Sequence, residues 1–243
     1  MKIDINCDVG EGVTNEHLLM PYISSCNIAC GGHFGDEKTI DNTLQLAIKN
    51  NVKIGAHPSF PDKNNFGRKV MYISNSELQK SIQNQMDLFL DRLDKTDARL
   101  HHIKPHGALY NLIAIDKIAA ENFMAAIKIY MRDVFLYVPY SSEIETIALR
   151  NNIKIKYEAF ADRNYTDDLK LVSRIEEKAI IKKPKEVYNH IYSMLCKGKV
   201  NTISGSQKEI KTDTFCIHGD HKNALKILEF LTEEFAKNGI KIG

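Results

Sequence analysis

Two kinds of hydrophobic pattern alternate along this 243-residue chain. Short apolar runs are typical of buried strands, whereas apolar residues that recur at every third or fourth position are typical of amphipathic helices. Their alternation predicts an α/β fold with a largely parallel sheet and crossover helices. The predicted strands are Lys2–Cys7, Cys26–Cys30, Lys53–Ala56, His102–Lys104, Phe135–Val138, Ile155–Phe160 and Thr214–Ile217.

Helices are predicted between these strands. The segment Ser74-Asn-Ser76-Glu77 has the sequence of a capping box and opens a helix whose apolar face continues to Leu93. The other predicted helices are Asp36–Asn50, one through Ile118, Phe123 and Ile127, then Ser142–Arg150, Pro184–Cys196 and Asn223–Lys237.

The number of strands and the absence of a linker favour one domain. About seven strands are predicted, and no Pro/Gly/Ser-rich segment or change of composition divides the chain. We therefore expect residues 1–243 to form a single β/α barrel of the distorted TIM type, with a β-hairpin excursion near 199–213.

Composition narrows the class of protein. Lys and Arg number 33 against 31 Asp and Glu, so the net charge is only +2 and no basic stripe supports nucleic-acid binding. No apolar run has the length of a membrane span and the N-terminus lacks a signal-peptide pattern, so we expect a cytoplasmic protein that binds no membrane.

The five cysteines form no CxxC pair, which favours reduced thiols. Cys7, Cys30 and Cys216 are expected to be buried, and of these only Cys30, beside Gly31 and Gly32, is a candidate nucleophile.

Polar clusters follow several of the predicted strands. The segments are DINCDVG (4–10), NIACGGH (27–33), GAHP (55–58), KPHG (104–107) and HGD (218–220). Because the carboxyl ends of parallel strands open onto one rim, these clusters are expected to meet in an active site. Asp4, Asn6 and Asp8 alternate along the first strand, so they share one face, which we interpret as a polar row inside the barrel.

These clusters also carry a family resemblance. The stretches IDINCDVGEG, SCNIACGGHFGD, GAHPSFPD followed by FGR, KPHGALYN, EAFADRNY and CIHGD resemble, in order and spacing, the LamB/YcsF family. The resemblance implies a distorted β/α barrel related to the glycoside hydrolase and polysaccharide deacetylase barrels. It also implies an ATP-dependent 5-oxoprolinase activity, in which the lactam ring of 5-oxo-L-proline is opened to L-glutamate together with subunits B and C.

Lactam opening sets chemical requirements that the clusters can meet. The reaction needs carbonyl activation, a nucleophilic water and a proton for the leaving nitrogen, and a phosphate-bearing intermediate needs cationic groups. The expected catalytic residues are Asp8, His33, His57, Lys104 and His106. The expected substrate-binding residues are Asn6, Asn27, Gly31, Gly32, Asp62, Arg68, Asp162, Arg163, His218 and Asp220. Among these, the Gly31-Gly32 pair is either an anion-binding backbone turn or simply a tight turn.

Two cofactors are considered for this chain, a divalent metal ion and ATP. Asp8, His33 and His57 are candidate ligands of a divalent metal, although no HxxxH or HExxH spacing is present. ATP is expected from the resemblance, but the chain has no GxxxxGK[ST] motif, so the nucleotide binds either through an unrelated site or on a partner subunit.

One loop departs from the family pattern. Leu169 and Lys178 stand where the family usually has glycine, and we expect the loop to adopt another turn because a positive φ is costly for both residues.

The sequence is also compatible with two functions other than that of a 5-oxoprolinase subunit. One is a stand-alone metal-dependent hydrolase such as a carbohydrate deacetylase, and the other is a non-catalytic binding subunit.

Overall fold

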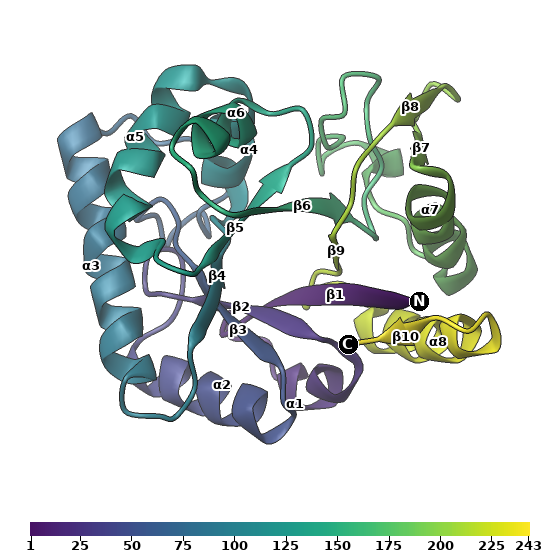
Figure 1. Ribbon diagram of the computed structural model, residues 1–243, viewed down its shortest axis with the longest axis horizontal. Coiled ribbons are helices and arrows are strands. Elements are labelled where there is room, and N and C mark those ends of the chain that lie inside the picture. Colours follow the sequence, from purple (N-terminus) through teal and green to yellow (C-terminus); the bar gives the residue numbers. More distant parts are fainter.

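Seven parallel strands close into a barrel in the computed structural model, which describes every residue from 1 to 243 (Figure 1). The order around the barrel is β1-β2-β3-β4-β5-β6-β9, and β9 pairs with β1 to close it. The α/β TIM-like barrel of about seven strands is thereby confirmed. The strands are β1 (Lys2–Val9), β2 (Ser25–Ala29), β3 (Lys53–His57), β4 (Leu100–Ile103), β5 (Phe135–Pro139), β6 (Ile155–Phe160) and β9 (Thr214–Cys216).

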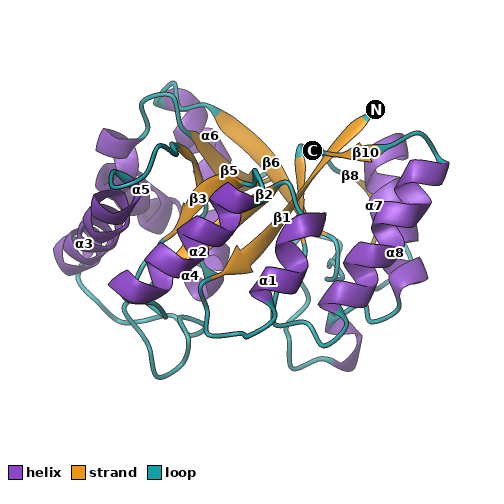
Figure 2. Cartoon of the chain, turned by 90° about the horizontal axis from the view of Figure 1, so that it is seen from below, coloured by secondary structure: helices purple, strands orange, loops and turns teal.

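Helices surround the barrel and bury their apolar faces against the strands (Figure 2). They are α1 (Glu16–Leu19), α2 (Glu37–Lys49), α3 (Asn75–Leu93), α4 (Gly107–Ile115), α5 (Lys117–Ile127), α6 (Glu143–Arg150), α7 (Pro184–Lys197) and α8 (Ala224–Lys237), with short 3₁₀ turns at Met20–Tyr22, Lys128–Tyr130 and Glu177–Ala179. The predicted capping box at Ser74 is present, with Glu77 as its partner. No helix is long and apolar enough to cross a membrane.

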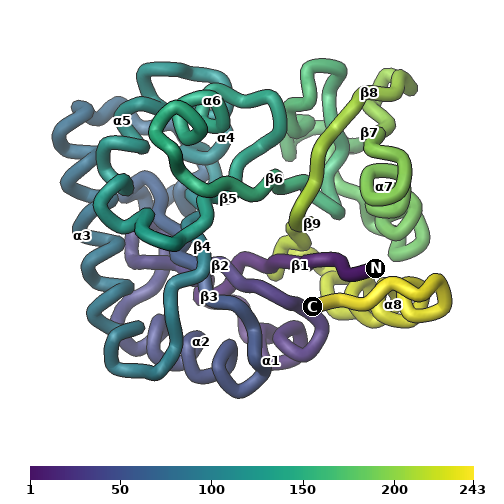
Figure 3. Tube along the Cα trace, viewed as in Figure 1, coloured from purple at the N-terminus to yellow at the C-terminus, as the bar shows by residue number.

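Two regions lie outside the regular alternation of strand and helix. Strands β7 (Lys199–Asn201) and β8 (Gln207–Glu209) pair antiparallel beyond the barrel, within the range 199–213 given for the hairpin. The last strand, β10 (Lys241–Ile242), pairs with the start of β1, so the two termini lie side by side (Figure 3). No helix was expected over α1 or α4 and no strand over β10.

The interior of the barrel is polar along β1. Asp4 accepts hydrogen bonds from the hydroxyl groups of Ser24, Ser25 and Thr214, and both Asn6 and Asp8 are buried above it. The interior row predicted from the alternation along this strand is therefore present. Such buried polar groups are tolerated because each one finds partners on a neighbouring strand.

The loop that was expected to avoid positive φ does not do so. Leu169 has a φ of 60°, and its N–H donates to Thr166 O (3.0 Å) to close the turn. The expectation for Leu169 was wrong because the residue adopts a positive φ, while its side chain packs partly against the core. Lys178 instead lies in the 3₁₀ turn Glu177–Ala179, where no positive φ is needed.

Candidate active site

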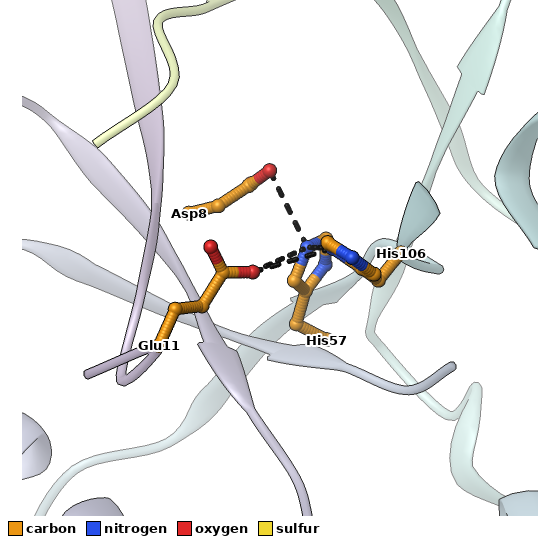
Figure 4. A group of neighbouring side chains, drawn as sticks. All are labelled: Asp8, Glu11, His57 and His106. Carbon is orange, nitrogen blue, oxygen red and sulfur yellow. Dashed lines mark hydrogen bonds and ion pairs between the residues drawn. The ribbon is translucent and has the colours of Figure 1, made fainter. Parts of the chain in front are cut away.

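Charged and imidazole side chains converge at the carboxyl ends of three strands. Asp8 lies near the end of β1, His57 is the last residue of β3, and Lys104 and His106 follow β4. Glu11, in the turn after β1, joins them and was not predicted. Figure 4 shows four of these side chains pointing toward one another across the mouth of the barrel. The convergence that the sequence predicted for this rim is observed for Asp8, His57, Lys104 and His106.

Lys104 joins two buried acids. Its Nζ lies 2.9 Å from Asp8 Oδ1 and 2.9 Å from Glu158 Oε1, and all three side chains are almost fully buried. Burial lowers the pKa of Lys104, but the two carboxylates outweigh it and hold that pKa well above its usual range. Burial likewise raises the pKa of Asp8, and the charges of His57 and Lys104 bring it well below its usual range. Lys104 is therefore a fixed cation.

Glu11 and two histidines form the second part of the cluster. Glu11 Oε1 lies 3.2 Å from His106 Nδ1 and 3.8 Å from His57 Nε2. The two imidazole nitrogens are 3.0 Å apart, and Asp8 Oδ2 lies 3.4 Å from His57 Nε2. Burial and the charge of Asp8 raise the pKa of Glu11 well above its usual range. Two acids with opposite pKa shifts, beside two imidazoles, suit a site of proton transfer.

Backbone carbonyls determine the tautomers of both histidines. His57 Nδ1 lies 2.7 Å from Lys104 O, and His106 Nε2 lies 3.0 Å from Phe66 O. A carbonyl oxygen only accepts, so these two nitrogens carry the protons. In the neutral rings, His57 Nε2 and His106 Nδ1 consequently present their lone pairs to the centre of the cluster.

His33 lies behind this cluster. Its Nε2 contacts Glu11 Oε1 at 2.9 Å, and its ring stacks on that of His106 with centroids 3.7 Å apart. Burial lowers the pKa of His33 to about 2, so it stays neutral and donates to Glu11. His33 therefore orients Glu11 and His106, and it is not among the four residues whose potential ligand atoms lie closest together.

Asn6 and Asn27 lie beneath the cluster. Asn27 donates to Asp8 Oδ1 (2.7 Å) and to Asn6 Oδ1 (2.8 Å), while Asn6 donates to Glu158 Oε1 (2.9 Å). Both are fully buried, and protein partners use their hydrogen-bonding groups. In this structure they position Asp8 and Glu158, and direct contact with a substrate stays a prediction.

A cleft of about 330 Å³ opens above the cluster, with Asp8, His57, Lys104 and His106 on its wall. Arg68, Arg163 and Arg174 also line it. Arg68 donates to Asp220 Oδ2 (2.6 Å), and Arg174 lies 3.5 Å from the same oxygen. Arg163 is buried and donates to Val172 O (2.6 Å), which ties the loop after β6 to the cleft. The cleft can therefore offer cations to an anionic ligand.

His218 reaches the cleft from the end of β9. Asp162 holds it, because the His218 backbone N–H donates to Asp162 Oδ2 (3.0 Å) and Nδ1 lies 2.9 Å from Oδ1. Burial raises the pKa of Asp162, but His218 lowers it overall to about 2. Asp162 is fully buried and thus orients His218 without lining the cleft itself.

Of the ten expected binding residues, only Arg68, Arg163 and His218 line this cleft, and Gly31, Gly32 and Asp62 lie away from it. Gly31 has a φ of 95° and donates its N–H to Phe34 O (2.7 Å), so that group is not available to an anion. Gly32 packs so closely that a Cβ would lie 2.3 Å from Gln85 Oε1. The pair is thus a tight turn that positions His33. Asp62 caps the turn before Arg68 by accepting from Asn65 N (3.1 Å).

The candidate nucleophile Cys30 is not suited to that role. It is fully buried, its Sγ accepts from His57 N (3.2 Å), and burial raises its pKa to about 12. The thiolate is the reactive form of cysteine, so this residue is inert. Cys7, Cys26 and Cys216 are also buried and free, which agrees with the expectation of reduced thiols.

Glu11 and Glu158 are the main site residues that sequence reasoning missed. Glu11 stands three positions after Asp8 in a glycine-flanked turn, so the rule that polar residues follow strand ends would have found it. Glu158 lies in the buried half of β6, beside Ala159 and Phe160, where an acid signals an inward-facing partner. Tyr110 also lines the cleft, from α4, and its hydroxyl group is buried without a hydrogen-bond partner.

Comparison with known proteins covers nearly the whole chain. The LamB/YcsF family matches residues 3–243. The chain is 38% identical over 246 residues to the 5-oxoprolinase A subunit of Bacillus cereus strain ATCC 10987, with 99% of this chain and 97% of the relative aligned. It is 37% identical over 241 residues to the 5-oxoprolinase A subunit of Haemophilus influenzae strain PittEE, with 99% and 98% aligned.

Solved structures agree with this match. The lactam utilization protein from Thermus thermophilus superposes with a TM-score of 0.92 at 31% identity, covering 100% of this chain and 99% of that one. A GH113 β-1,4-mannanase has a TM-score of 0.53 at 11% identity, covering 96% and 98%, and shares the fold alone. With the barrel, the rim cluster and these matches in agreement over its full length, the chain belongs to the LamB/YcsF family.

Proposed function

We propose that this chain is the A subunit of an ATP-dependent 5-oxoprolinase, which opens the lactam ring of 5-oxo-L-proline to L-glutamate together with subunits B and C. The main support for this proposal is the set of side chains that line the cleft. Proton-transfer groups, a buried lysine and three arginines share one rim there, in a family whose relatives are named as A subunits of 5-oxoprolinase.

Each part of the cleft suits one requirement of the reaction. Water must add to the lactam carbonyl carbon, the C–N bond must break, and the nitrogen must gain a proton. Asp8 and Glu11 with His57 and His106 supply groups that take up and return that proton. Lys104 is a fixed positive charge beside them, suited to the oxygen that gains negative charge.

The arginines suit the anionic end of the substrate. Both 5-oxo-L-proline, through its carboxylate, and a phosphorylated lactam are anions, and arginine binds such groups through two parallel hydrogen bonds. Arg68 and Arg174 now share Asp220, so a bound anion competes with that carboxylate. We propose that ATP activates the lactam oxygen by phosphorylation, which makes the carbonyl carbon more open to attack by water.

The test is ATP-dependent glutamate release from 5-oxo-L-proline, measured for this chain alone and with subunits B and C. We expect release only from the complete set with ATP. The partners are first shown to be competent with another A subunit. If they then release no glutamate with this chain, the proposal fails.

A second function has one specific observation in its favour. Asp8, Glu11, His57 and His106 offer ligand atoms within 4.8 Å of one another, which suits a stand-alone metal-dependent hydrolase such as a carbohydrate deacetylase. That function predicts hydrolysis of acetylated sugars by the chain alone, without ATP and with loss of activity in a chelator. A non-catalytic subunit predicts instead that substitutions at His57 and His106 leave the activity of the complex unchanged.

A further inference from the structure

The centre of the rim cluster brings four acceptor atoms together. They are Asp8 Oδ2, Glu11 Oε1, His57 Nε2 and His106 Nδ1, all within 4.8 Å of one another (Figure 4). Since Lys104 O and Phe66 O accept from the other nitrogen of each ring, both of these nitrogens direct lone pairs inward when the rings are neutral. Two lone pairs 3.0 Å apart repel each other, and either a shared proton or a metal ion bound by both nitrogens removes this repulsion.

The spacing matches that of metal ligands. Ligand atoms around a tetrahedral ion with bonds of 2.0–2.2 Å are separated by about 3.4 Å. The four separations given by the structure are 3.0, 3.2, 3.4 and 3.8 Å. We propose that Asp8, Glu11, His57 and His106 bind one divalent first-row transition-metal ion, such as Zn²⁺ or Mn²⁺. The cation site stands on this geometry, and it rests on the proposed function only for the reaction that it serves.

Surrounding residues hold each ligand in place. Asp8 Oδ1 accepts from Asn27 and Lys104, which leaves Oδ2 to face the cluster. The two carbonyls hold the imidazole rings, and His33 holds Glu11. Such outer contacts are a regular feature of protein metal sites, because they fix the orientation and the tautomer of the ligands.

The charge balance also favours a divalent ion. When ionised, Asp8, Glu11 and Glu158 carry three negative charges in a buried region, and Lys104 supplies one positive charge. The two negative charges that are left uncompensated equal, with opposite sign, the charge of one divalent cation. Two imidazole nitrogens and two carboxylate oxygens favour a transition metal over Mg²⁺ or Ca²⁺, which prefer oxygen ligands.

A neighbouring group of metal-ligand types does not form a second site. Asp8, Cys216 and His218 also lie close together. However, Lys104 Nζ lies 2.9 Å from Asp8 Oδ1 and 3.1 Å from Cys216 Sγ, so an ammonium group already lies beside these two ligands. The proposal is therefore confined to the group that faces the cleft through Asp8, His57 and His106.

The test measures metal binding directly on the full chain, stripped with a chelator and dialysed. Calorimetric titration with Zn²⁺ and with Mn²⁺ is expected to show a single ion per chain. His57→Gln and His106→Gln are each expected to weaken binding by about 100-fold or more. The matched control is His17→Gln, which removes an exposed histidine that is not among the four ligands and is expected to bind as the wild type does.

A crystal of the metal-soaked wild type locates the ion without a variant, so it tests the site even if the variants do not fold. Anomalous scattering is expected to show a peak among the four ligand atoms. The proposal is overturned if the folded wild type binds no ion, if the peak lies elsewhere, or if folded His57→Gln and His106→Gln bind as the wild type does. Metal binding without glutamate release from the complete enzyme would refute the proposed function and leave this site standing. Glutamate release from the complete enzyme, with no ion bound by the folded wild type, would overturn this site and leave the proposed function standing.

Discussion

Lys104 lies between two buried carboxylates, and its charge compensates both Asp8 and Glu158. Replacing it with Met leaves those acids buried without a cation. We therefore expect Lys104→Met to lower the free energy of unfolding by about 3–5 kcal/mol. Chemical denaturation measures this loss.

A double variant shows how much of the stability lost in Lys104→Met comes from uncompensated charge rather than from the changed shape of the side chain. Lys104→Met combined with Glu158→Gln removes one of the stranded charges, so we expect it to recover part of the lost stability. Equal losses in the single and the double variant would contradict the assigned charge balance.

Asp162 is predicted to make stability depend on pH. Its pKa is lowered from 3.8 to about 2 in the folded chain, where it accepts two hydrogen bonds from His218. A lowered pKa stabilises the fold above the unfolded value of 3.8, and this contribution declines as pH falls toward 2. We expect Asp162→Asn to cost about 2 kcal/mol at pH 6 and roughly half as much at pH 3. Urea denaturation at both pH values measures the difference, and a cost that does not change with pH would refute this assignment.

At the scale of elements, the backbone of α4 lies very close to the backbone of the loop that carries Arg68. Gly107 has a φ of 56°, and a Cβ there would lie 2.7 Å from Gly67 O. Ala108 N donates to the same carbonyl (2.9 Å), so the contact cannot open freely. We expect Gly107→Ala to displace the Arg68 loop, raise the KM for 5-oxo-L-proline and destabilise the fold by about 2 kcal/mol or more.

Gly198 provides the matched control for Gly107. It also has a positive φ, 62°, as the C-cap of α7, but a Cβ there meets nothing closer than 3.8 Å. Gly198→Ala should therefore cost only about 1 kcal/mol, from backbone strain alone, and leave the KM unchanged. If the two alanine variants behave alike, the close contact at Gly107 has no role in placing the loop.

Most strands and long helices could be predicted from local pattern, and the exceptions have physical causes. The residues of α4 are apolar almost throughout, so no period marks the helix, and His106 gives it no side-chain cap. The strand β10 has two residues and is defined by its partner β1. Leu169 keeps its turn because tertiary contacts offset the unfavourable backbone conformation.

At the scale of the whole molecule, the barrel explains why a rim of reactive residues could be predicted but its inner geometry could not. Parallel strands bring their carboxyl ends together, so the convergence of Asp8, His57 and His106 follows from topology. Whether a polar residue lines the cleft or supports another depends on depth in the barrel, which a sequence does not encode locally. Asn6, Asn27 and His33, for example, contact Glu158, Asp8 and Glu11 from positions behind the cleft.

The central claim is that this rim performs lactam opening when the chain is assembled with subunits B and C. The most direct measurement is glutamate formed per minute by the reconstituted complex with ATP and 5-oxo-L-proline, comparing wild type, Asp8→Asn, His106→Gln and the control His17→Gln. We expect wild type and His17→Gln to form glutamate at equal rates, and the two cluster variants to lose at least about 100-fold. Wild-type rates from folded Asp8→Asn and His106→Gln would contradict the claim.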